Sequence, residues 1–124
     1  MGGFKDLKVY SKAFRLAMEI FETTKKFPVE EKFCLTSQIR NSPRSVCANI
    51  AESYRKRQYI AHFRSKVSDA DMENSETQVW LDFALECSYL TKIQYDDLIN
   101  KSYEIGKLLS YMLNHPEKYK STPQ

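Results

Sequence analysis

The most constraining feature of this sequence is a helical repeat of apolar residues, which recurs in four segments of the 124-residue chain. In each segment the apolar side chains follow one another at spacings of three and four, the spacing that places them on one face of an α-helix. Alternation of apolar and polar residues, which is typical of a strand, is nowhere long enough to compete. The pattern therefore predicts an all-α fold.

The first two segments span residues 7–24 and 30–54. Pro28 separates them, because a proline cannot continue a helix. The second segment contains Pro43 in its middle. A proline there removes one backbone hydrogen bond and clashes with the preceding turn, so we expect a kink or a break near residues 40–42.

The third segment, residues 59–88, is the longest and carries two sets of apolar positions. One set alternates spacings of four and three, as in the narrow seam of a bundle helix. The positions of this seam are Phe63, Val67, Ala70, Asn74, Thr77, Leu81 and Ala84. Val79, Trp80 and Phe83 lie beside the seam, so the apolar surface is too wide for one antiparallel neighbour. We expect something outside the helix to cover them.

The fourth segment begins at Thr91 with the pattern Thr-x-x-Gln, in which the Thr91 hydroxyl and the Gln94 amide satisfy backbone groups at a helix N-terminus. Short connections between long helices favour antiparallel neighbours. We therefore predict an up-down-up-down antiparallel four-helix bundle over residues 1–113 as a single domain. A polar, frayed tail is expected over residues 114–124.

The composition is that of an ordinary globular protein, with 42% hydrophobic and 28% charged residues and only 3 Gly and 4 Pro. These values argue against a disordered chain and against a turn-rich β protein. No apolar run approaches the ~20 residues that a membrane-spanning helix needs, and the N-terminus lacks the features of a signal peptide. We expect a cytoplasmic protein with no membrane partner.

The cysteines of the chain, Cys34, Cys47 and Cys87, are odd in number and widely spaced, and no Cys-x-x-Cys pair occurs. This arrangement favours neither a disulfide framework nor a zinc site. We expect all three to be reduced residues of the hydrophobic core.

Residue patterns that support catalysis or metal binding are missing from the sequence. A dimetal centre in a four-helix bundle needs two Glu-x-x-His pairs, and neither His62 nor His115 has a glutamate three residues before it. Asp69, Glu73 and Glu76 offer oxygen ligands only, so a solvated or salt-bridged face explains them better. Glycine-rich phosphate loops are also absent, and we predict no enzyme activity, no metal and no cofactor.

Charge is distributed unevenly. Residues 1–66 carry 14 Lys or Arg and 6 acidic residues, a net of +8, whereas residues 67–124 carry 5 and 10, a net of −5. A candidate nucleic-acid-binding group consists of Arg40, Arg44, Arg55, Lys56 and Arg57. The alternative is that these side chains pair with the acidic residues Asp69, Asp71, Glu73 and Glu76. The sequence pI of 8.7 is below that of dedicated nucleic-acid domains, which favours the pairing.

The aromatic residues of the third segment indicate a different use. Trp80 and Phe83 lie among acidic residues that would repel a phosphate backbone. Aromatic residues are also enriched in the cores of protein interfaces. We therefore predict that Val79, Trp80 and Phe83 form an oligomer interface, in which the basic face of one copy meets the acidic face of the next.

Motifs in three parts of the chain occur together in a known family. They are FKDLKVY at residues 4–10, LTSQIR and SVCANIAE within residues 35–52, and ENSETQVWL at residues 73–81. On these motifs the chain resembles the bacterial four-helix-bundle proteins named after the intervening sequences of 23S ribosomal RNA genes. The accessory proteins of diversity-generating retroelements are related to that family. The resemblance runs from Phe4 to about Leu113, and Pro43, Cys47 and Ser53 depart from the family pattern.

The resemblance implies a bundle that assembles into a ring, typically a pentamer, and that has no catalytic activity. The retroelement relatives bind nucleic acid and a reverse transcriptase. The resemblance therefore favours an oligomeric scaffold that binds DNA or RNA through the basic residues. A structural or protein–protein interaction scaffold with no nucleic-acid role is the alternative.

Overall fold

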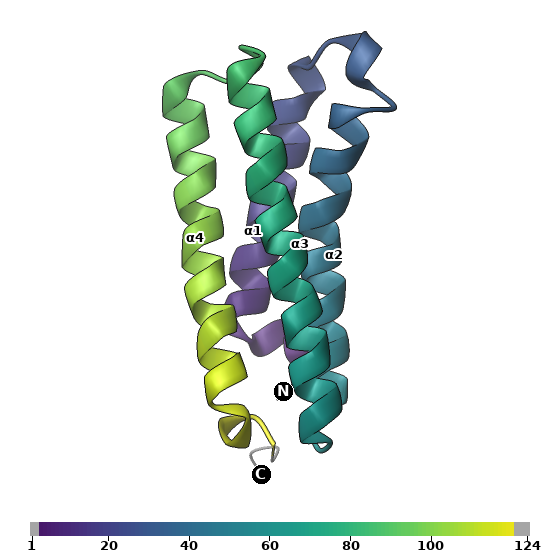
Figure 1. Ribbon diagram of the computed structural model, residues 1–124, viewed down its shortest axis with the longest axis vertical. Helices are drawn as coiled ribbons and strands as arrows, with labels where there is room; N and C mark the ends of the chain where they lie inside the picture. The colour runs from purple at the N-terminus through teal and green to yellow at the C-terminus, as the bar shows by residue number, and fades with distance from the viewer. Residues whose placement is uncertain (1–2, 121–124) are drawn as a thin grey trace.

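The computed structural model describes residues 3–120 and contains four long helices. They are α1 (Lys8–Thr23), α2 (Leu35–Arg55), α3 (Ile60–Glu86) and α4 (Lys92–Asn114). The helices lie side by side and run alternately in opposite directions, so that each is antiparallel to the next in the chain (Figure 1). No strand occurs among the described residues. The predicted all-α class and up-down-up-down four-helix bundle are confirmed.

The core lies along the bundle axis, where each helix contributes its apolar stripe. From α1 the buried residues are Val9, Ala13, Leu16, Ala17 and Ile20. From α3 the buried residues are Phe63, Val67, Ala70, Asn74, Thr77, Leu81 and Ala84, which confirms every position of the predicted seam. Because that seam is narrow, apolar residues of α3 on the opposite side of the helix, such as Val79 and Phe83, face outward and stay exposed.

The start of α4 agrees with the sequence prediction, whereas the start of α2 differs from it. The Thr91 hydroxyl accepts from the Gln94 backbone N–H, and the Gln94 side chain accepts from the Thr91 backbone N–H, so the predicted capping box is confirmed. The second helix was expected to start near Glu30, but α2 starts at Leu35. A 3-10 turn occupies residues 29–31, and Glu31 Oε1 accepts from the Leu35 N–H at 3.2 Å.

Pro43 does not break α2, which runs without interruption from Leu35 to Arg55. Of the two expected outcomes, a break is excluded, and a kink at this proline stays a prediction. Pro43 cannot donate the backbone hydrogen bond that would normally reach the carbonyl of Ile39. Both residues are buried, and packing of the flanking turns holds the helix together across the missing bond.

Two buried polar contacts link α3 to its neighbours. On the α4 side, Asn74 Nδ2 donates to the Ser102 carbonyl at 2.9 Å, and the Ser102 hydroxyl donates to Asn74 Oδ1 at 3.0 Å. On the α2 side, the hydroxyls of Ser42 and Thr77 lie 2.8 Å apart and share a hydrogen bond. Such contacts form only in one alignment of the helices, so they fix the register of α3 against α2 and α4.

The cysteines do not all lie in the core. Cys47 is buried, whereas Cys34 and Cys87 are exposed at the ends of α2 and α3. The expectation of three core cysteines is wrong, because residues that flank a helix end are not held to its apolar stripe. Burial raises the pKa of the Cys47 thiol to about 11, so this thiol is the least reactive of the three.

Beyond α4 the chain forms a 3-10 turn at Pro116–Lys118. The ring of Tyr119 then stacks on the core residue Phe63, with 5.6 Å between the ring centres. This contact lies within the segment expected to form a polar tail, and residues 121–124 of that tail lie outside the described part of the chain.

Replacing Asn74 with Ala is expected to lower the free energy of unfolding by about 2 kcal/mol, because the Ser102 hydroxyl is left without its buried acceptor and a small cavity opens. Urea denaturation followed by circular dichroism measures the change. The matched control is Asn100→Ala on the exposed face of α4, which should shift the free energy by less than about 0.5 kcal/mol. Equal stabilities of the two variants would contradict this role of Asn74.

Candidate interaction surfaces

The predicted basic residues do not form one patch. Arg40 and Arg55 are separated by 15 residues of continuous helix, which is about 22 Å at 1.5 Å per residue. Arg40 and Arg44 lie beside the end of α1. Arg55 and Lys56 lie where α2 leads into α3, at the end of the bundle that also holds the C-terminal end of α4 (Figure 1).

Arg40 holds the end of α1 against α2. Its Nε donates to Thr24 Oγ1 at 2.8 Å, and its Nη2 donates to the carbonyl of Phe21 at 3.4 Å. Its guanidinium carbon also lies 4.7 Å from the centre of the Phe21 ring. A cation suits this place, because the last carbonyl groups of a helix carry partial negative charge. Arg40 is therefore engaged within the subunit, and a role in binding nucleic acid stays a prediction.

Arg44 and Arg57 each lie over an aromatic ring. The guanidinium of Arg44 is 5.7 Å from the ring centre of Phe21, and that of Arg57 is 4.2 Å from the ring centre of Tyr54. Arg57 also donates to the Tyr54 carbonyl at 2.9 Å. Arg44 remains exposed to solvent and Arg57 is half-buried, so Arg44 keeps more of its surface available to a partner.

Arg55 and Lys56 are both exposed at the end of α2. Within residues 3–120 neither side chain forms a hydrogen bond or an ion pair. Two adjacent unpaired cations cost little when solvated and can contact a phosphate without giving up an internal bond. Of the five predicted basic residues, these two are exposed and their side chains have no hydrogen-bond or ion-pair partner among the described residues.

One ion pair links α2 to α3, but its cation, Lys66, lies on α3 and its closer carboxylate, Glu52, lies on α2. Lys66 Nζ lies 2.9 Å from Glu52 Oε1 and 3.9 Å from Asp69 Oδ2. The hydrogen bond to Glu52 is the main cause that raises the pKa of Lys66. Arg40 and Arg44 form no ion pair with the described acidic residues of α3. Binding of nucleic acid by the five basic residues stays a prediction.

The outer face of α3 carries an apolar stripe made of Met72, Val79 and Phe83, which we call the outer stripe. Their exposed fractions are 62%, 46% and 54%. Trp80, also predicted for the interface, is half-buried against the core and lies 6.1 Å from Phe83 between ring centres. The sequence analysis did not predict Met72 as part of this surface. Met72 lies seven residues before Val79, which is two helical turns and places both side chains on one helix face.

Acidic side chains border the outer stripe. Glu76 is exposed within it, Glu73 lies on its α2 side, and Glu86 follows it. None of the three forms an ion pair among the described residues. Partial burial, and then the charges of Glu76 and Asp69, raise the pKa of the Glu73 carboxyl. The outer stripe is thus an apolar surface with uncompensated negative charge.

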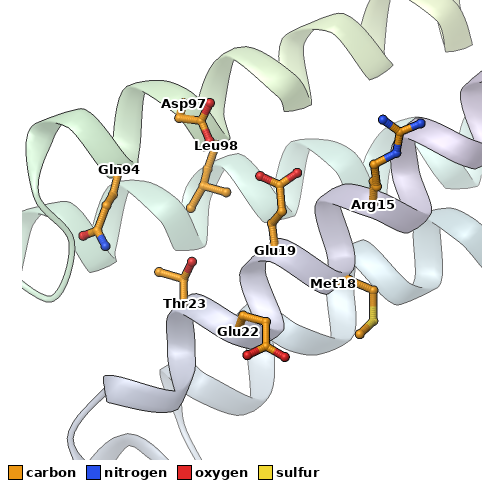
Figure 2. Close-up of a pocket in the computed structure, with 8 residues that line it drawn as sticks. All are labelled: Arg15, Met18, Glu19, Glu22, Thr23, Gln94, Asp97 and Leu98. Atoms are coloured by element: carbon orange, nitrogen blue, oxygen red, sulfur yellow. The ribbon is translucent and has the colours of Figure 1, made fainter.

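A groove of about 550 Å³ lies between α1 and α4. Figure 2 shows Glu19 and Leu98 pointing into the space between the two helices, whereas Met18 and Glu22 point away from α4. Glu19 Oε1 is 2.5 Å from the Lys101 ammonium, which is also paired with a neighbouring carboxylate of α4. The groove contains no nucleophile beside a general base, so it supports no catalytic arrangement.

The described residues also contain no group of three His, Cys, Asp or Glu side chains that could hold a metal ion. None of their helices is both long enough and apolar enough to cross a bilayer.

Comparison with known proteins identifies the family of this fold. A family model described as 23S rRNA-intervening sequence protein matches residues 5–111. The chain belongs to the 23S rRNA-intervening sequence protein family. No curated protein matches it. The resemblance seen in the sequence motifs is therefore confirmed.

A solved relative shows the same architecture. It is a protein of unknown function from the S23 ribosomal protein family of Bacteroides thetaiotaomicron VPI-5482. Its structure superposes with a TM-score of 0.78 at 34% sequence identity, over 86% of this chain and 95% of the relative. Neither the family model nor this relative is described as an enzyme.

Replacing Arg40 with Ala is expected to lower the free energy of unfolding by about 1–3 kcal/mol, since the variant lacks two hydrogen bonds from a charged donor and a cation–π interaction. Thermal or urea denaturation measures the effect. Arg44→Ala is the matched control and should change the free energy by less than about 1 kcal/mol, because the interaction of Arg44 with Phe21 is exposed to solvent. An Arg40→Ala variant as stable as the wild type would contradict the structural role.

Proposed function

We propose that this protein is a non-enzymatic scaffold whose copies associate through the outer stripe of α3. The observation that carries the proposal is the exposure of Met72, Val79 and Phe83 in one row on one helix. Isolated exposed apolar residues are ordinary on a protein surface. A row of them with no cover in the subunit is typical of an interaction site.

The energetics of burial support association at this stripe. Full burial of a side chain of the size of Val, Met or Phe contributes about 1.5–3 kcal/mol, and these three are about half exposed. Aromatic anchors near the centre of an interface carry much of the binding energy. Phe83, with Trp80 beside it at 6.1 Å, supplies such an anchor.

The number of copies follows from the family resemblance and not from the subunit itself. A ring, typically a pentamer, is the assembly that the resemblance implies. A ring uses two different surfaces on each copy, one that inserts and one that receives. The outer stripe supplies the first of these surfaces.

Replacing Val79 and Phe83 together with Ser should weaken self-association at least about tenfold, because the interface then buries less apolar area. Sedimentation or light scattering over a concentration series measures the change. The matched control is Ile93→Ser on α4, where an apolar side chain that is 83% exposed is removed from outside the stripe. Equal effects of the two variants, or a wild type that is monomeric throughout, would contradict the proposal.

Nucleic-acid binding is the second candidate function, and the exposure of Arg55 and Lys56 favours it. Tyr59 is also exposed nearby, with the His62 ring edge-on to it at 6.2 Å between centres. Cations beside an exposed ring suit the phosphates and bases of a single strand. An oligomer would repeat this small site, so that several weak contacts act together.

Changing Arg55 and Lys56 together to Ser should weaken binding to single-stranded DNA or RNA. The slope of log affinity against log salt concentration should become shallower by about 0.7 for each phosphate that the variant no longer neutralises. A salt titration of the affinity measures both effects. Lys26→Ser with Lys107→Ser is the control with the same change of charge at two exposed lysines elsewhere. Binding that is absent at low salt, or that the two double variants weaken equally, would exclude this second function.

A further inference from the structure

We propose that the outer stripe of α3 docks on the face formed by α1 and α2 of a second copy of the same chain. We call this receiving surface the α1–α2 face and define it by Tyr10, Phe14, Phe21, Arg40 and Arg44. This inference rests on the proposed self-association and adds the identity of the partner surface. The apolar and the charged parts of the two surfaces each support it.

The apolar part of the α1–α2 face is a row of aromatic rings along α1. Tyr10 and Phe14 stack with 6.2 Å between ring centres, and Phe14 is 52% exposed. Phe21 continues the row about two helical turns further along, where the cations of Lys25, Arg40 and Arg44 lie over its ring. From Tyr10 to Phe21 the row spans 11 residues, or about 16 Å. The outer stripe, from Met72 to Phe83, also spans 11 residues, so the two rows match in length.

Small residues of α2 leave room beside this row. The contact of Arg40 and Arg44 with Phe21 sets the antiparallel register of α1 and α2. In that register Phe14 lies level with residues 48–51 of α2, which include Ala48 and Ala51. Side chains of alanine size let the helix of a second copy approach closely, as they do in tight helix pairs.

The charges of the two surfaces are opposite. The α1–α2 face is bordered by Lys5 at one end and Arg44 at the other, both exposed and without an ion pair among the described residues. The outer stripe carries Glu73, Glu76 and Glu86, which likewise form no ion pair among residues 3–120. Complementary charges around an apolar centre select one partner surface and one orientation.

The crowding of negative charge on α3 fits the same partner. The pKa of the Glu73 carboxyl is raised by partial burial and by Glu76 and Asp69, which means that its ionised form is disfavoured in the isolated subunit. A cation supplied by the second copy would relieve this repulsion. A receiving face with acidic residues would increase it.

The groove between α1 and α4 is a poorer receiver for this reason. Its lining includes Glu19, Glu22 and Asp97, with Arg15 as the single cation among the lining residues. These carboxylates already hold the nearby ammonium groups of Lys25 and Lys101 in ion pairs, which leaves fewer free cations there for the glutamates of the outer stripe. The α1–α2 face, by contrast, presents cations on both flanks of an apolar row.

The positions of the two surfaces on the subunit also fit closed assembly. The α1–α2 face and the outer stripe lie on different helices, with α2 between α1 and α3 in the bundle. When two different surfaces of a subunit do not lie on opposite sides, each added copy is rotated relative to the copy before it. Such contacts close into a ring when the rotation allows it.

Charge reversal on each surface separately, and then on both, tests the inference. The first variant carries Glu76→Arg and Glu86→Arg, and the second carries Lys5→Glu and Arg44→Glu. Each variant then has two surfaces of like charge and should self-associate at least about tenfold more weakly than the wild type. The four substitutions combined in one chain restore opposite charges and should recover association to within about threefold of the wild type.

Sedimentation of the full chain measures association, and circular dichroism confirms that each variant is folded. Lys107→Glu with Lys118→Glu, at exposed positions outside both surfaces, is the control with the same change of charge as the Lys5→Glu/Arg44→Glu variant and should associate like the wild type. Association unchanged in either two-site variant, or not recovered in the combined variant, would overturn the partner surface.

Two further outcomes separate the inference from its alternatives. A wild type that stays monomeric overturns the proposed function, and this inference with it. A Lys5→Glu/Arg44→Glu variant that associates normally but no longer binds a polyuridylate probe shows that the α1–α2 face binds nucleic acid and not a second copy, which also overturns the inference.

Discussion

The helical period of α3 is the constraint on which the rest of the structure depends. At 3.6 residues per turn a helix can direct only one stripe toward the bundle axis. The stripe from Phe63 to Ala84 takes that place. Met72, Val79 and Phe83 are then forced onto the opposite side, where they stay exposed. The same residues cannot be buried within this subunit unless α3 rotates, and rotation would expose the seam.

Polar contacts in the core prevent that rotation. Asn74 bonds to Ser102 on α4, and Thr77 bonds to Ser42 on α2. A turned α3 would leave these groups buried without partners, which costs about 1–3 kcal/mol for each group. The interior of the bundle therefore determines which surface faces outward. The association that we propose follows from the packing of the core and does not need a separate binding device.

Much of this arrangement could be predicted from the sequence, because it depends on local rules. The seam of α3 and the capping box at Thr91 follow from spacing alone. The contacts of Arg40 could not be predicted, since they depend on how the end of α1 meets α2 in space. Continuity of α2 through Pro43 likewise depends on packing around the proline. The distribution of charged residues in the sequence also does not distinguish the cations that are engaged within the subunit from those that remain at the surface.

In the assembly that we propose, a second copy covers the outer face of α3. Trp80 is the one tryptophan of the chain and lies beside Phe83, so its fluorescence reports on this surface directly. The most direct measurement is acrylamide quenching of Trp80 in the wild type as the protein is diluted from associated to monomeric concentrations. We expect quenching to increase on dilution, together with the fall in mass. Quenching that stays constant while the mass falls would place the contact elsewhere and contradict docking on the outer stripe.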